Sequence, residues 1–149
     1  MYKHIMLPID GSELSLKAEK ECVGFAKSIG AKVTAIHVVP HFHLNVSAWG
    51  TPKEMITKIE DGHDQETKTM AQRMLAELEN RIKAGGIECD SLLVVGDNPY
   101  EAIIENAGKR QCDLIMMASH GHRGMDAVLL GSETVKVLTH TKVPVLVVR

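Results

Sequence analysis

Five short, continuously apolar runs recur along the 149-residue chain, and amphipathic segments lie between them. Continuous hydrophobicity is typical of strands that are buried on both faces, and such strands belong to parallel sheets. The expected strands are residues 5–9, 33–39, 92–95, 114–118 and 143–148. The regular alternation of strands and helical segments predicts an α/β fold, an open five-stranded parallel sheet with helices on both faces.

Each amphipathic segment predicts a helix. The expected helices begin near Ser12, ahead of Ala71, near Asn98 and at Ser132. The third has the clearest start, because Asn98 is a good capping residue, Pro99 suits the first helical position and Glu101 follows the cap by three residues.

The connection from Pro40 to Gly62 departs from this pattern, because about twenty residues is long for a loop in a compact domain. Its piece Pro52–Ile56 favours a helical turn. The rest is expected to form a mobile flap or a surface for a partner.

Composition limits the possible partners. The net charge is -2 with lysine and arginine dispersed among acidic residues, which argues against a nucleic-acid partner. No apolar stretch approaches the roughly 18 residues of a membrane span, which argues against a membrane partner.

The cysteines (Cys22, Cys89 and Cys112) are odd in number and far apart, which favours reduced thiols and a cytoplasmic location. The length fits one domain over residues 1–149.

Ligands of open α/β sheets bind beyond the carboxyl ends of the strands, where the strand order reverses. The first strand ends in Pro8-Ile-Asp-Gly-Ser12, and Asp10 could accept hydrogen bonds from a ribose or hold Mg²⁺ through water. A structural interpretation is equally open, in which Asp10, Gly11 and Ser12 form a turn and a helix cap.

A second candidate site follows the fourth expected strand. Gly121 and Gly131 permit backbone conformations with positive φ that direct N–H groups at phosphate oxygens, and Ser132 adds a hydroxyl at a helix N-terminus. The chain contains neither a P-loop nor a G-x-G-x-x-G fingerprint after its first strand. The sequence therefore argues against a P-loop nucleotide hydrolase and against a dehydrogenase that transfers hydride.

Three features together resemble the universal stress protein family. They are Pro8-Ile-Asp10, the [GA]-x-x-G-x₉-G-[ST] pattern from Ala118 to Ser132, and the closing Val143–Val148 run. The resemblance covers essentially the whole chain. It implies a Rossmann-like fold of the adenine nucleotide alpha hydrolase type, a homodimer joined through the last strand, and binding of ATP or AMP in some members.

The resemblance also implies roles for individual residues. It puts Asp10 near the ribose and adenine, Val38 against the base, and Gly121, Gly131 and Ser132 at the phosphates. The full expected ligand-binding set is Pro8, Asp10, Val38, Met117, Ala118, Gly121, Gly131, Ser132, Glu133 and Thr134. No catalytic residue is assigned.

Ala118 departs from the family pattern, because ATP-binding members usually have glycine there. If this position needed a left-handed backbone, alanine would cost about 1–2 kcal/mol, or roughly tenfold in affinity.

The last strand is expected at a sheet edge, and an uncovered apolar edge invites pairing with a second copy across a two-fold axis. The sequence therefore predicts a cytoplasmic stress-response protein that is a dimeric regulatory binding module. It binds ATP or AMP, with Mg²⁺ accompanying ATP, and occupancy of the site biases its interaction with an unidentified protein partner.

Three alternatives stay open. One is a family member that binds no nucleotide and acts through protein partners alone. Another is a slow ATP hydrolase, in which Asp10 or His120 orders a water and Arg123 stabilises phosphate charge. The third is a metal site at His41 and His43, or at His120 and His122.

Overall fold

The computed structural model describes residues 1–43, 52–120 and 130–149. Five strands within these residues form one parallel sheet in the order β3-β2-β1-β4-β5. The strands are β1 (His4–Pro8), β2 (Lys32–Val39), β3 (Cys89–Val95), β4 (Leu114–Ala118) and β5 (Val145–Val148). The helices are α1 (Glu13–Ile29), α2 (Lys53–Ala84), α3 (Pro99–Lys109) and α4 (Ser132–His140). The expected α/β fold is confirmed.

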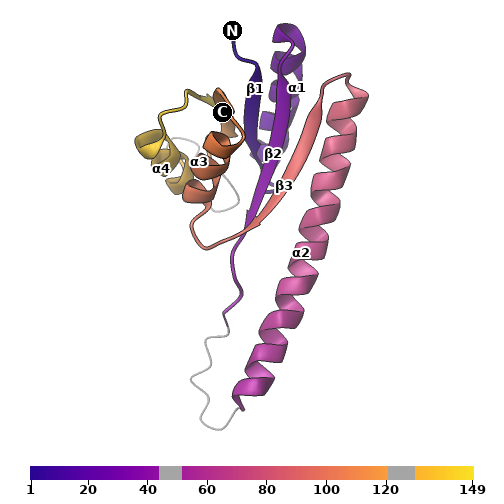
Figure 1. Cartoon of the computed structure of the whole chain (residues 1–149), viewed down its shortest axis with the longest axis vertical. Coiled ribbons are helices and arrows are strands. Elements are labelled where there is room, and N and C mark those ends of the chain that lie inside the picture. The colour runs from indigo at the N-terminus through magenta and orange to yellow at the C-terminus, as the bar shows by residue number, and fades with distance from the viewer. Residues whose placement is uncertain (44–51, 121–129) are drawn as a thin grey trace.

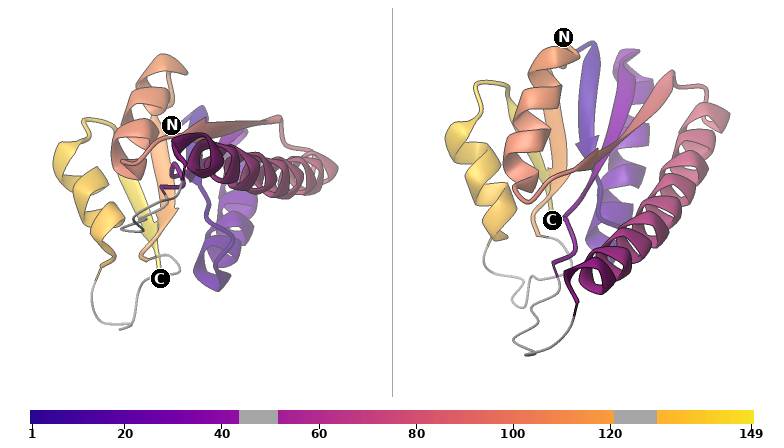
Figure 2. Two further views of the ribbon diagram at one scale, coloured as in Figure 1. Left: turned by 90° about the horizontal axis from the view of Figure 1, so that it is seen from below. Right: turned by 60° about the horizontal axis from the view of Figure 1, so that its bottom comes forward.

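Helices cover both faces of this sheet, α1 and α2 on one and α3 and α4 on the other (Figures 1 and 2). Leu7 packs in the core beneath α1 and α2, whereas its neighbour Met6 packs in the core beneath α3 and α4. Because consecutive strand residues face opposite sides, a strand covered on both faces must be apolar throughout.

The start of α1 follows the expectation, and local contacts define both of its ends. The Ser12 hydroxyl accepts a hydrogen bond from the Ser15 backbone N–H at 3.2 Å, which caps the helix. Gly30 ends it with a left-handed backbone (φ 70°), a conformation that glycine adopts without steric cost.

The long loop expected from Pro40 to Gly62 is wrong in its second half, because α2 begins at Lys53. The Pro52 carbonyl accepts the first hydrogen bonds of this helix, from Met55 at 2.9 Å and Ile56 at 3.3 Å. The amino-terminal half of α2 projects beyond the carboxyl ends of the strands (Figure 1). It buries no apolar stripe there, so the sequence carries no core periodicity to reveal it. No helix in the described parts of the chain has the length and apolar character needed to cross a membrane.

The start of α3 is confirmed, but the expected cap is not. Asn98 occupies the cap position, yet its side-chain amide donates to Glu101 at 3.3 Å and its side-chain oxygen accepts no hydrogen bond from the first N–H groups of the helix. The Tyr100 N–H donates at 3.0 Å to the carboxylate of Glu133 at the start of α4. A residue from another helix therefore satisfies the backbone group that a local cap would serve.

Strand boundaries shift slightly from the expected ones. β3 begins at Cys89, because Cys89 pairs with Val33 on the neighbouring strand. β5 begins at Val145, directly after Pro144, which has no N–H to donate to a sheet ladder.

All three cysteines are buried and unpaired. Burial is the main cause that raises the pKa of the Cys22 and Cys89 thiols to about 12 and that of Cys112 to about 11. These thiols stay protonated near neutral pH, as expected for packed cysteines without a nucleophilic role.

A polar network lies at the amino end of the sheet. His4 is buried, and its Nε2 lies 2.8 Å from the hydroxyl oxygen of Thr34. The Thr34 hydroxyl donates to Asp90, which also pairs with Arg110. Burial lowers the pKa of His4 from its ordinary value, and the positive charge of Lys32 lowers it further.

We expect this histidine to make the protein less stable in mild acid. A lowered folded-state pKa means that the unfolded chain binds the proton more tightly, so His4 favours unfolding as the pH drops below about 6.5 and has no such effect above it. Urea unfolding at about pH 7.5 and about pH 5.5 should therefore show a larger loss of stability for the wild type than for His4→Gln. Equal losses in the two proteins would contradict this role.

Candidate functional site

The strand order reverses between β1 and β4, which are neighbours in the sheet although β2 and β3 lie between them in sequence. Pro8 pairs with Ile36, so two residues further on Asp10 is level with Val38. Met6 pairs with Ile115, which puts Ser119 at the same level on the other side. Residues from three adjacent strand ends thus meet at the sheet edge where ligands bind in such folds.

The turn after β1 is built by its own polar side chains. Asp10 Oδ1 accepts a hydrogen bond from the Ser12 N–H at 2.9 Å. The Ser15 hydroxyl accepts from the N–H groups of Asp10 at 3.3 Å and Gly11 at 3.2 Å, and Gly11 has a φ of 80°. The interpretation of Asp10, Gly11 and Ser12 as a turn and helix cap is confirmed, and a ligand-binding role of Asp10 stays a prediction.

An apolar surface lies beside this turn. Met117 is buried in the core beneath α3 and α4, and the half-buried Val38 packs against the same core. Pro8 faces that side too, because it follows the buried Met6 by two strand positions. These three residues of the expected set share one face of the sheet at its carboxyl edge, as a flat base would require.

Hydrogen bonds hold the start of α4 against the end of β4. The Thr134 hydroxyl is buried and donates to the carbonyl of Ala118 at 3.1 Å. The Gly131 N–H donates to the carbonyl of Ser119 at 2.8 Å. Thr134 therefore positions this helix, and its expected contact with a ligand stays a prediction.

Ala118 carries none of the strain considered for it. It is a residue of β4 that pairs with Val148, and Gln111 is the one non-glycine residue in the described chain with a positive φ. The cost that a left-handed alanine would bring therefore does not apply.

The reason expected for glycine at position 131 is wrong. Gly131 has a φ of −61°, which any residue adopts. A Cβ atom there would lie 3.0 Å from both Cα and Cβ of His120 and 3.4 Å from the Ser119 carbonyl oxygen. Glycine is needed because α4 starts against the chain that leaves β4.

The first turn of α4 carries Ser132 and Glu133. Ser132 is exposed, and no side chain among the described residues caps this helix. The N–H groups of its first turn are thus suited to an anion. The Glu133 carboxylate binds the Tyr100 N–H and pairs with Lys136 at 2.8 Å.

Part of the expected site lies outside the described residues. Gly121, His122 and Arg123 are in this part of the chain. His120 is described, and its Nδ1 lies 3.1 Å from the Ser119 hydroxyl.

The His41 and His43 pair approaches two aspartates. His41 Nδ1 lies 3.9 Å from a carboxylate oxygen of Asp64, and His43 Nε2 lies 3.9 Å from one of Asp97. Among residues 1–43, 52–120 and 130–149, no three His, Cys, Asp or Glu side chains are grouped to hold a metal ion.

Two residues that contact the start of α4, Ser119 and Tyr100, were not predicted from the sequence. Ser119 accepts the hydrogen bond from Gly131, and counting one residue past the end of β4 could have identified it. The other is Tyr100, whose backbone N–H donates a hydrogen bond to the carboxylate of Glu133, 33 residues away in sequence. No local signal predicts that contact.

The fold and its strand-order reversal define an open, Rossmann-like α/β domain with a candidate ligand site at the carboxyl edge. The model of the universal stress protein family matches residues 1–149. Universal stress protein MJ0531 of Methanocaldococcus jannaschii is 34% identical over 154 residues, which cover 100% of this chain and 83% of that protein. The chain belongs to the universal stress protein family.

Solved structures agree in fold. That of MJ0577 matches with a TM-score of 0.84 at 28% identity and covers 99% of this chain and 96% of its own. A universal stress protein in complex with cAMP has a TM-score of 0.70 at 23% identity, with 99% and 97% of the two chains covered. One from Archaeoglobus fulgidus in complex with dAMP has a TM-score of 0.66 at 21% identity, covering 99% and 98%.

Proposed function

We propose that this protein is a cytoplasmic, dimeric binding module of one domain that takes up an adenine nucleotide, ATP or AMP, at the carboxyl edge of its sheet. Occupancy of this site would bias its interaction with a protein partner. The observation that supports the proposal is the convergence of the Asp10 turn, Val38 and the start of α4 where the strand order reverses. Two relatives of the same fold form complexes with adenine nucleotides.

The phosphates would bind at the first turn of α4. Its N–H groups and the exposed Ser132 hydroxyl are hydrogen-bond donors at the positive end of the helix dipole. Gly131 lets this turn approach the end of β4 without a clash. Gly121 would add a further backbone donor, as the family pattern suggests.

The base and ribose would lie on the other side of the β1 end. Val38 and Pro8 are half-buried and supply apolar surface on one face of the sheet, and the buried Met117 belongs to the core on that same face. The carboxylate of Asp10 is suited to accept a hydrogen bond from the ribose, or to hold Mg²⁺ through water when ATP is bound.

The decisive experiment identifies the ligand directly. Protein purified without added nucleotide is denatured, and released small molecules are identified by chromatography and mass spectrometry. Calorimetric titrations with ATP and AMP, with and without Mg²⁺, then measure affinity. Released adenine nucleotide, or saturable binding, supports the proposal. Failure of both would overturn it and favour a family member that acts through protein partners alone.

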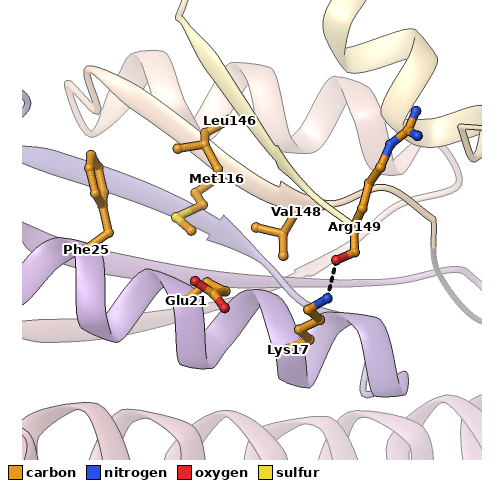
Figure 3. Close-up of a pocket in the computed structure, with 7 residues that line it drawn as sticks. All are labelled: Lys17, Glu21, Phe25, Met116, Leu146, Val148 and Arg149. Carbon is orange, nitrogen blue, oxygen red and sulfur yellow. Dashed lines mark hydrogen bonds between the residues drawn. The ribbon is translucent and has the colours of Figure 1, made fainter.

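The dimer would form through β5. This strand hydrogen-bonds only to β4 among the described strands. A cavity of about 330 Å³ beside it has Phe25, Met116, Leu146 and Val148 among its lining residues (Figure 3). An apolar sheet edge of this kind suits pairing with a second copy.

We expect Val147→Lys to produce monomers in light scattering, because a lysine on the edge strand opposes strand pairing. Val135→Lys is the matched control, since Val135 is an exposed valine on α4. It should leave the dimer intact. A wild-type monomer, or a dimer that survives Val147→Lys, would contradict this interface.

A further inference from the structure

One carboxylate connects the two helices on the α3 and α4 face. Glu133 lies in the first turn of α4, and one of its oxygens accepts the Tyr100 N–H from the first turn of α3 at 3.0 Å. Its other oxygen pairs with Lys136 at 2.8 Å. α3 and α4 lie side by side (Figure 2), so this contact spans the interface between them.

The negative charge of Glu133 lies at the N-termini of both α3 and α4. The N-terminus of a helix attracts negative charge, and Glu133 supplies such a charge to α4 and to α3 at once. Lys136 offsets part of that charge. The Glu133 carboxylate therefore offsets part of the positive potential at the start of α4. A phosphate bound there would also be repelled by this negative charge, one residue beyond Ser132.

We propose that Glu133 is not a nucleotide ligand but the residue that sets the preference among nucleotides, by disfavouring those with more phosphate charge. This inference rests on the proposed function and adds a specificity to it. Repulsion from the carboxylate grows with the number of phosphate groups near α4, so it penalises ATP more than AMP. The same repulsion would move the carboxylate away from Tyr100, so that a bound triphosphate loosens the start of α3.

The test compares wild type with Glu133→Gln. Glutamine keeps an oxygen that accepts from the Tyr100 N–H but removes the charge. We expect the affinity for Mg²⁺-free ATP to rise about fivefold and that for AMP by less than about twofold. The amide proton of Tyr100 should also exchange faster in wild type when ATP binds, and should not do so in Glu133→Gln.

Glu101→Gln is the matched control. Glu101 also lies in the first turn of α3, but its carboxylate binds the Tyr100 hydroxyl at 2.8 Å and Asn98. The same loss of charge there should leave the ratio of ATP to AMP affinity unchanged. An unchanged ratio in Glu133→Gln, or equal shifts in both variants, would overturn the inference while leaving the proposed function intact. Absence of nucleotide binding by wild type would overturn both.

Discussion

Gly131→Leu should lose nucleotide binding altogether at ligand concentrations that saturate the wild type. The first side-chain carbon would lie 3.0 Å from two atoms of His120, so the start of α4 must move away from β4. That movement breaks the 2.8 Å hydrogen bond from Gly131 to the Ser119 carbonyl and displaces the N–H groups proposed to bind phosphate. We expect an accompanying loss of about 1–3 kcal/mol in the free energy of unfolding, as overpacking typically costs.

The control for this variant is Gly108→Ala, and Gly131→Ala is a second test variant that introduces the Cβ atom alone. Gly108 lies inside α3 with open space where a Cβ would be. Alanine there should leave binding unchanged and stabilise the fold by up to about 1 kcal/mol. Gly131→Ala should weaken binding measurably even though the added group is a single methyl. A Gly131→Leu protein that is destabilised but still binds ATP at wild-type affinity would exclude the α4 terminus as the phosphate site.

Arg81→Leu should destabilise the fold by about 2–3 kcal/mol in urea unfolding, because it leaves a buried carboxylate without a partner. The Glu19 side chain is only 8% exposed, and its two oxygens accept from Nε and Nη2 of Arg81, each at 2.9 Å. This pair joins α1 to α2. The Arg81 side chain is half exposed, so we expect a smaller loss than for a fully buried pair.

Two comparisons isolate the buried charge as the cause. Lys83→Met removes an exposed pair with Glu79 on the same helix and should change stability by less than about 0.5 kcal/mol. The double variant Glu19→Leu/Arg81→Leu should be more stable than Arg81→Leu alone, because it removes the unpaired carboxylate as well. If the double variant is the less stable of the two, the unpaired charge is not the cause.

The fold could be predicted because its signals are local. Strands buried on both faces must be apolar throughout, so residues such as Ile5–Leu7 reveal themselves without their neighbours. The cap at Ser12 and the left-handed Gly30 likewise depend on contacts within a few residues. The first half of α2 was not predicted, because the buried residues of this helix all lie in its second half and an exposed helix leaves no apolar period in the sequence.

The sequence by itself determined the class of fold and the identity of the motif residues after β1 and β4. Only the tertiary structure decided what several of them do. Gly131 is needed for a close approach to His120, Thr134 ties α4 to Ala118, and Glu133 caps a different helix at Tyr100. Each of these roles depends on a partner 11 to 33 residues away in sequence. Local propensity carries no information about such pairs, because only the packing of α3 and α4 on the sheet brings the two partners together.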